Sequence, residues 1–319
     1  MWSWITGWLD GLARPGLEEA PDDPTEALTR RVRRLELRAA RLVQEHLGGA
    51  YESVFKGQGI EFDEVREYQA GDDPRRIDWN VTARMDRPYV KTFAEERELT
   101  ILLVVDVSAS AEFGSGAQRK RELAAELVAT IAGSALRNQD PVGLCLFSDR
   151  VALYLPPHKG RGHIHRLIRQ VLEVHPEGPG TRYDVVVPVL MRLPRRCVVF
   201  FISDFLSDGY ERPLRLLATR HDLVPVSVLD PRERQLPEVG LVRLRDPETG
   251  QVAVVDTSDP AAREAYQVTV AAHLAASVAF FQRLGCDHLA LVTDQGCLKP
   301  LLRFFRARQG RRSRRRACS

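Results

Sequence analysis

The sequence predicts an α/β protein whose core is a mostly parallel sheet with helices on both faces. Four short runs are almost continuously apolar, without the alternation of a strand that has one face in water. Each run is separated from the next by segments with helical periodicity, an alternation that is typical of a parallel sheet covered on both sides. The predicted strands are 99–106, 196–205, 222–231 and 287–294.

Helices and hairpins fill the intervals between these strands. Two segments have strand character on both sides of a turn, which predicts hairpins at 141–157, turning at 148–150, and at 243–256. Apolar residues three and four positions apart predict the helices. The predicted helices are 119–137, 163–174, 183–193, 210–220 and 260–284.

Composition divides the chain into four parts. The first holds a Pro- and acid-rich linker and an amphipathic helix over 25–47, which Gly48 and Gly49 end. The second is rich in short β-like pieces such as 89–93 and in charges of both signs. The parts are 1–48, the linker and amino-terminal helix; 49–98, a β-rich arm; 99–305, the sheet domain; and 306–319, a basic tail predicted to be disordered.

The positive charge of the chain comes from its carboxyl end. Segment 303–316 holds eight arginines and no acid, and leaving these arginines out lowers the net charge from +3 to −5. Such a tail can contact nucleic acid, an acidic partner or anionic lipid, but no nucleic-acid-binding module accompanies it. We therefore expect a solvated tail and no specific nucleic-acid partner.

Hydropathy and cysteine usage predict a cytoplasmic protein. No apolar run reaches the roughly 18 residues that a membrane-spanning helix needs, and the first residues lack the features of a signal peptide. The five cysteines are scattered and show no Cys-x-x-Cys spacing. This favours a reducing compartment over disulfides or thiolate-bound zinc.

Oxygen-bearing side chains follow the predicted strands. Asp106, Ser108 and Ser110 alternate directly after the first strand, Asp204 follows the second, and Thr181 lies in a loop before a helix. Ligands of an open parallel sheet bind outside the carboxyl ends of its strands, near the reversal in strand order. We therefore expect these five side chains to converge on one place.

Two carboxylates and three hydroxyls are hard oxygen ligands, which suit Mg²⁺ or Mn²⁺. Because most of these ligands are neutral, the ion would keep much of its positive charge and an open coordination position. The carboxylate of another molecule fits such a position. The residues therefore predict metal-dependent binding of an acidic partner.

The same residues carry a resemblance. Asp-x-Ser-x-Ser, a loop Thr and a strand-end Asp resemble the metal-ion-dependent adhesion site of von Willebrand factor type A domains, over roughly residues 99–300. The arm resembles the signature of a bacterial family, domain of unknown function fifty-eight, which is usually encoded beside a MoxR-type AAA+ ATPase. The arm residues that carry this resemblance are Glu61-Phe62, Arg66-Glu67-Tyr68, Gly71-Asp72, Arg75, Asp78-Trp79 and Ala83-Arg84.

The resemblance implies a von Willebrand factor A-like, Rossmann-type fold and a role for each residue. Ser108 and Ser110 would ligate the metal directly, Thr181 in some states, and Asp106 and Asp204 directly or through water. It also implies binding in place of catalysis, with a MoxR-type ATPase and an acidic protein ligand as partners. Many family members have amino-terminal membrane helices, which this sequence does not show.

Two other interpretations stay open. Asp and Ser after a strand are ordinary turn formers and helix N-caps. An aspartate after a buried strand also begins the site of haloacid-dehalogenase-like hydrolases, which makes a metal-dependent phosphohydrolase the alternative function. Those enzymes need a second carboxylate at the position of Ser108, and Gly114-Ser115-Gly116 with Lys120 lacks the spacing of a phosphate loop.

Two charged clusters lie outside these residues. His158, His163 and His165 are candidates for zinc, but no Cys, Asp or Glu stands at ligand spacing. In the arm, arginines interleave with acidic residues. We expect an ion-pair network that fastens the arm to the sheet domain, with a docking surface for an ATPase as the alternative.

Overall fold

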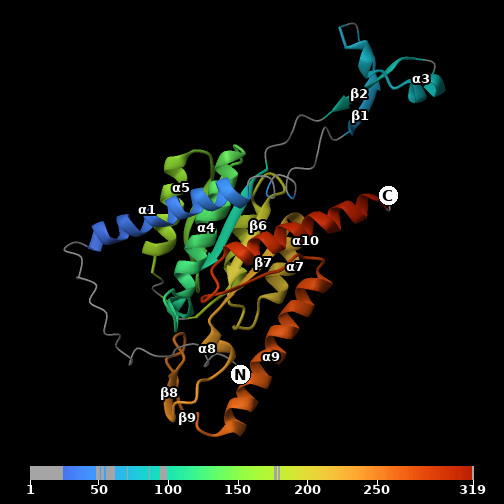
Figure 1. Ribbon diagram of the computed structural model, residues 1–319. Helices are drawn as coiled ribbons and strands as arrows, with labels where there is room; N and C mark the ends of the chain where they lie inside the picture. Colours follow the sequence, from blue (N-terminus) through green and yellow to red (C-terminus); the bar gives the residue numbers. More distant parts are fainter. Residues whose placement is uncertain are drawn as a thin grey trace.

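The computed structural model describes residues 24–47, 51, 54, 62–69, 71–85, 87–93, 99–175, 178 and 180–317 (Figure 1). The predicted linker before residue 24, and Gly48 and Gly49 after the first helix, lie outside the described residues. The last two residues of the predicted tail also lie outside them.

A six-stranded sheet forms the centre of the fold, in the order β10–β7–β6–β3–β4–β5. β5 pairs antiparallel with β4, and the other neighbours are parallel. Numbered within this domain, the order is 3-2-1-4-5-6, that of a Rossmann-type sheet. The predicted fold class is confirmed. The strands are β3 Ile101–Asp106, β4 Val142–Phe147, β5 Val151–His158, β6 Val198–Ser203, β7 Asp222–Leu229 and β10 Leu289–Val292.

Helices cover both faces of the sheet. Alternate residues of each strand point to opposite faces, so each strand contributes side chains to a core on both sides. Ile101, Leu103 and Val105 of β3 belong to a buried cluster that includes residues of α1, α4, α5 and α10. Leu102 and Val104 belong to a second cluster with α6, α7 and α9. The continuously apolar runs in the sequence therefore result from strands with a core on each side (Figure 1).

Most predicted helices are present within a few residues of their expected ends. The segment expected to be one helix over 183–193 differs: it begins with a 3-10 turn, η4 Tyr183–Val186, before the short helix α6. The main helices are α1 Pro24–Leu42, which continues as η1 Val43–Leu47, α4 Lys120–Arg137, α5 Arg161–Glu173, α6 Val187–Met191, α7 Glu211–Arg220, α9 Pro260–Arg283 and α10 Leu298–Ala317.

Both predicted hairpins are confirmed. β4 and β5 form the first, and β8 Leu241–Arg245 with β9 Val252–Asp256 forms the second. The second hairpin is a separate two-stranded sheet. A short helix, α8 Pro231–Arg234, lies between β7 and this hairpin in the chain.

The basic carboxyl end is helical, so the prediction of a disordered tail from residue 306 is wrong as far as Ala317. Leu301, Phe304 and Phe305 of α10 are buried in the core that faces β3 and α4. Arg308 on the same helix is 4% exposed and pairs with Asp222 at the start of β7. The apolar stripe and this ion pair fasten the helix to the sheet domain, and Arg303, Arg306 and Arg311 lie on its exposed side.

The arm forms a small unit of its own, with β1 Phe62–Glu67 antiparallel to β2 Tyr89–Phe93, and with η2 Pro74–Arg76 and α3 Trp79–Met85 between them. Figure 1 places it away from the sheet domain. The described ion pairs Arg66–Asp72 and Arg87–Glu67 join arm residues to each other. These two pairs therefore stabilise the arm itself.

A partly buried histidine, His288, lies just before β10 and gives the fold a predicted pH dependence. His288 Nε2 hydrogen-bonds with Ser227 Oγ at 2.9 Å, and its ring lies 5.1 Å from that of Phe281. Burial lowers the pKa of His288 to about 4, whereas an unfolded histidine titrates near about 6.5.

The unfolded chain therefore binds the extra proton first as the pH falls, and the fold loses stability between about pH 6.5 and 4, by up to about 3 kcal/mol from this group. Urea unfolding across this range should show a shallower pH dependence for His288→Gln than for the native chain. Equal slopes would mean that His288 is protonated without cost in the fold.

Candidate functional site

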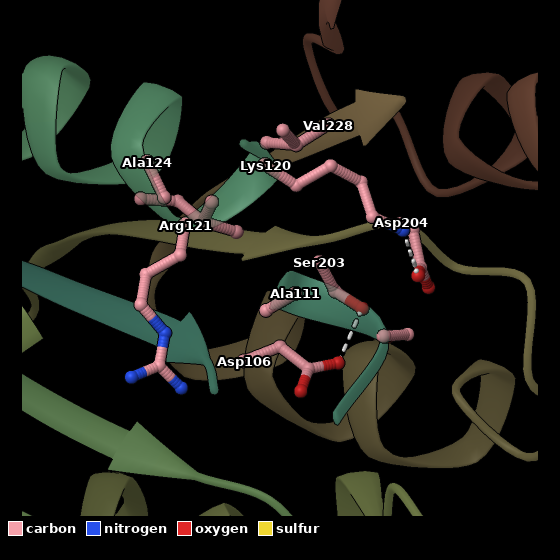
Figure 2. Close-up of a pocket in the computed structure, with 10 residues that line it drawn as sticks. Asp106, Ala111, Lys120, Arg121, Ala124, Ser203, Asp204 and Val228 are labelled. Carbon is pink, nitrogen blue, oxygen red and sulfur yellow. Dashed lines mark hydrogen bonds and ion pairs between the residues drawn. The ribbon is translucent and has the colours of Figure 1, made fainter. Parts of the chain in front are cut away.

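The predicted site residues meet where the strand order reverses, between β3 and β6. These strands are parallel neighbours, with Val105 opposite Ile202, so Asp106 at the end of β3 lies beside Ser203 at the end of β6. Ser203 Oγ donates to Asp106 Oδ2 at 2.8 Å (Figure 2). The ends of both strands are buried, and Asp106 is 7% exposed.

The loop after β3 gathers the two serines of the motif. Ser108 N–H donates to Asp106 Oδ1 at 2.9 Å, which is the turn-forming contact expected of an aspartate. Ser108 stands at the N-cap position of η3 Ala109–Glu112, but its side chain makes no capping hydrogen bond. Its hydroxyl oxygen lies 3.1 Å from that of Ser110. The turn explains why Asp106 Oδ1 accepts a hydrogen bond, but it gives no role to the hydroxyls of Ser108 and Ser110.

Thr181 and Asp204 complete the group. Thr181 Oγ1 lies 3.5 Å from Asp106 Oδ2, and the Arg182 N–H that follows it donates to Ser148 O at 2.8 Å, which fixes the loop beside β4. A hydrogen bond from the Ser110 hydroxyl helps to lower the pKa of Asp204. The structure thus links all five predicted residues, from Thr181 through Asp106 and the two serines to Asp204.

Lys120 at the start of α4 was missed as a site residue. Its Nζ donates to Asp204 Oδ2 at 2.8 Å and to Glu233 Oε1 at 2.6 Å, and Figure 2 shows its contact with Asp204. Lys120 is 3% and Glu233 is 2% exposed. The sequence held a signal for this, because Lys120 begins the apolar stripe that continues at Leu123 and Leu127.

Glu248 was also missed. It lies in the turn between β8 and β9, where its Oε1 accepts from Thr181 Oγ1 at 2.9 Å and its Oε2 accepts from Ser207 Oγ at 3.4 Å. The Ser108 hydroxyl also donates a hydrogen bond to the Glu248 carboxylate, which acts to lower the pKa of that group. Nothing in the local sequence distinguishes this acid from an ordinary solvent-exposed turn residue.

The electrostatics of the site favour an added cation. Burial, and next the charge of Asp204, raise the pKa of Asp106 to about 7. Burial also acts to raise the pKa of Asp204, but the Lys120 ammonium group overcomes it and the pKa is lowered. Burial raises the pKa of Glu233 to about 7 and that of Glu248 above its usual value. When ionised, these four carboxylates outnumber the two buried cations beside them, the Lys120 ammonium group and the Arg121 guanidinium group.

The donor set fits a small hard cation. Three of the five residues, Asp106, Ser110 and Asp204, border a cavity of about 20 Å³ between α4 and the strand ends (Figure 2), about the size that a single water molecule needs. The buried side chains of Lys120 and Arg121 border the same cavity, so a cation would have to lie on its carboxylate side. Within the described residues, no three His, Cys, Asp or Glu side chains are arranged to hold a metal by themselves. The hydroxyls would therefore have to contribute, as Mg²⁺ and Mn²⁺ sites permit.

The histidines proposed for zinc have other contacts. His163 Nε2 lies 2.8 Å from Val142 O, and His165 Nδ1 lies 3.0 Å from Glu36 Oε1. The candidate phosphate loop is likewise engaged, because the backbone N–H and hydroxyl of Ser115 both donate to Asp230. Neither cluster is arranged as a separate site for zinc or phosphate.

The fold and the strand-end residues define an α/β domain with an oxygen-rich cluster at its switch point. The family described as protein of unknown function DUF58 matches residues 64–276, and the chain belongs to this family. Uncharacterized proteins of Mycobacterium tuberculosis and Mycobacterium bovis are each 37% identical to this chain over 292 residues. The matched residues cover 90% of this chain and 91% of each relative.

Solved structures match parts of the chain with TM-scores below 0.5. An aerotolerance-related membrane protein from Bacteroides fragilis matches with a TM-score of 0.43 and 15% identity over 67% of this chain and 99% of that one. The VWA domain of SpRpn10 matches with a TM-score of 0.33 and 13% identity, covering 41% of this chain and 76% of its own. In the part of this chain that the structure describes, no helix is long and apolar enough to cross a membrane.

Proposed function

We propose that this protein is a metal-ion-dependent protein-binding module. Asp106, Ser108, Ser110, Thr181 and Asp204 would hold Mg²⁺ or Mn²⁺, and an acidic side chain of a partner would complete the coordination. The observation that carries this proposal is the connected group of five oxygen-bearing side chains at the switch point of the sheet.

The residues of the proposed site would contribute to metal binding in different ways. Where Asp106 and Asp204 act through water, only neutral hydroxyls of this chain contact the ion directly, and a bound divalent ion keeps positive charge to attract a carboxylate. Lys120 offsets part of the charge of Asp204, and Ser203 holds Asp106 toward the strand end. An open position on a positively charged ion is suited to binding a carboxylate, and we propose binding in place of turnover as the role of the site.

The partner we propose is a MoxR-type AAA+ ATPase with an acidic residue on its docking surface. The resemblance of the arm to a family usually encoded beside such ATPases supports this choice. Four described cysteines are free thiols: Cys145, Cys197, Cys286 and Cys297. Free thiols support a reducing cellular compartment for this protein and its proposed ATPase partner.

Calorimetric titration of Mn²⁺ and Mg²⁺ into the metal-stripped chain tests the proposal. We expect saturable binding that weakens about tenfold or more in Ser108→Ala/Ser110→Ala, because both hydroxyls that face the site are lost. Ser258→Ala, which changes an exposed serine far along the chain, is the matched control. Binding of equal strength to all three proteins would place the metal elsewhere and overturn the proposal.

A further inference from the structure

The turn between β8 and β9 is built to hold one acidic side chain in a fixed place. Asp246 is fully buried and accepts from Glu248 N–H at 2.9 Å, while Gly250 N–H donates to Asp246 O at 2.8 Å. Gly250 has a φ of +72°, which favours glycine at this position. These contacts order the backbone on both sides of Glu248, so its direction is determined by the fold.

The Glu248 carboxylate contacts three loops that meet at the strand ends. Thr181 comes from the loop before η4, Ser207 from the loop after β6, and Ser108 from the loop after β3. Two of these hydroxyls, on Ser108 and Thr181, are among the proposed metal ligands. The carboxylate therefore occupies the outer side of the site, which is where the acid of a partner would have to enter.

We propose that Glu248 is an internal occupant of the position meant for the partner's acid, and that the β8–β9 hairpin must move away before a partner binds. This inference rests on the proposed function, because it assigns a role to Glu248 only if the five residues hold a cation. It adds a regulation that the five residues alone do not provide: the free protein is closed by its own side chain.

The hairpin is suited to such a movement. It is a two-stranded sheet apart from the central one, and Figure 1 shows it below α8, at the same end of the molecule as the lower end of α9. Isolated two-stranded sheets are marginally stable. Leu241 and Val254 on its outer face are 75% and 67% exposed, whereas Val242 and Leu244 on its inner face are buried.

The competing explanation is that Glu248 accepts hydrogen bonds only to order the Thr181 loop. The two explanations differ in what a bound ion would experience. If Glu248 fills the partner position, its removal frees that position for water or for another carboxylate. If it only orders the loop, the coordination of the ion is the same with and without it.

Water-proton relaxation by bound Mn²⁺ distinguishes these cases in the full-length chain. We expect Glu248→Gln to raise the relaxivity of bound Mn²⁺ by about one exchanging water and to weaken its affinity by about tenfold. Acetate, used as the probe for a partner's acid, should then lower the relaxivity of Glu248→Gln at concentrations that leave the native chain unchanged. Glu264→Gln, on the exposed surface of α9, is the matched control.

Hydrogen exchange supplies a second measurement that also reports on folding. In the native chain, Mn²⁺ should slow exchange of the β8–β9 amides, because the ion would tie Glu248 to the site, and Glu248→Gln should lack this protection. Equal relaxivity, acetate response and protection in both proteins, with Mn²⁺ bound, would overturn the inference and leave the proposed function standing. Absence of Mn²⁺ binding to either protein would overturn both.

Discussion

Asp106→Asn is expected to abolish Mn²⁺ binding while leaving the stability of the metal-free protein unchanged or slightly higher. The substitution preserves the size of the side chain, and its amide oxygen can still accept from Ser108 N–H. It also removes a buried carboxylate that lies close to the charge of Asp204. Loss of one charge within about 4 Å of a cation costs about 4 kcal/mol at an effective dielectric constant of about 20, so affinity should fall about 1000-fold.

Two measurements are needed, because loss of binding alone could follow from misfolding. Calorimetry gives the Mn²⁺ affinity, and urea unfolding in the presence of a chelator gives the stability of the metal-free chain. Asp208→Asn is the control, since Asp208 lies in the loop after the neighbouring strand β6 but is exposed. Retained Mn²⁺ binding in Asp106→Asn would contradict the proposed site. A large loss of metal-free stability would instead identify Asp106 as a structural carboxylate.

The sequence was sufficient to predict the sheet because its strands have a core on each side. Leu102 and Val104 pack on one face while Leu103 and Val105 pack on the other, so the run has no polar interruption. The five site residues were predictable for a related reason: parallel strands end at the same edge, and side chains that follow them converge there. Residues at the ends of neighbouring parallel strands therefore lie next to each other in the fold.

The contacts that were missed depend on segments whose placement the local sequence does not determine. Glu248 reaches Thr181 only because the β8–β9 hairpin lies over the strand ends, 67 residues along the chain from its partner. The helix at the carboxyl end was obscured by its arginines, although Leu301, Phe304 and Phe305 recur at helical spacing. Lys120 had a detectable pattern, but its two acidic partners come from other elements.

Lys120→Met is expected to lower the free energy of unfolding by about 3–5 kcal/mol, the cost of removing one partner from a buried ionic group. Lys120 is 3% exposed, and its loss leaves Asp204 and Glu233 buried without their shared cation. Urea unfolding in chelator measures the change. Adding Glu233→Gln to this variant should restore part of the loss, because the second carboxylate is then neutral.

The same variant also separates a structural role of Lys120 from a role beside a metal. In Lys120→Met, Asp204 retains its charge and faces the proposed site, so Mg²⁺ should stabilise this variant more than it stabilises the native chain. The double variant Lys120→Met/Asp204→Asn should lose that extra stabilisation. The contrary result is that Mg²⁺ stabilises Lys120→Met no more than it stabilises the native chain. That result would mean that Asp204 interacts with Lys120 and has no role in holding a cation at the switch point.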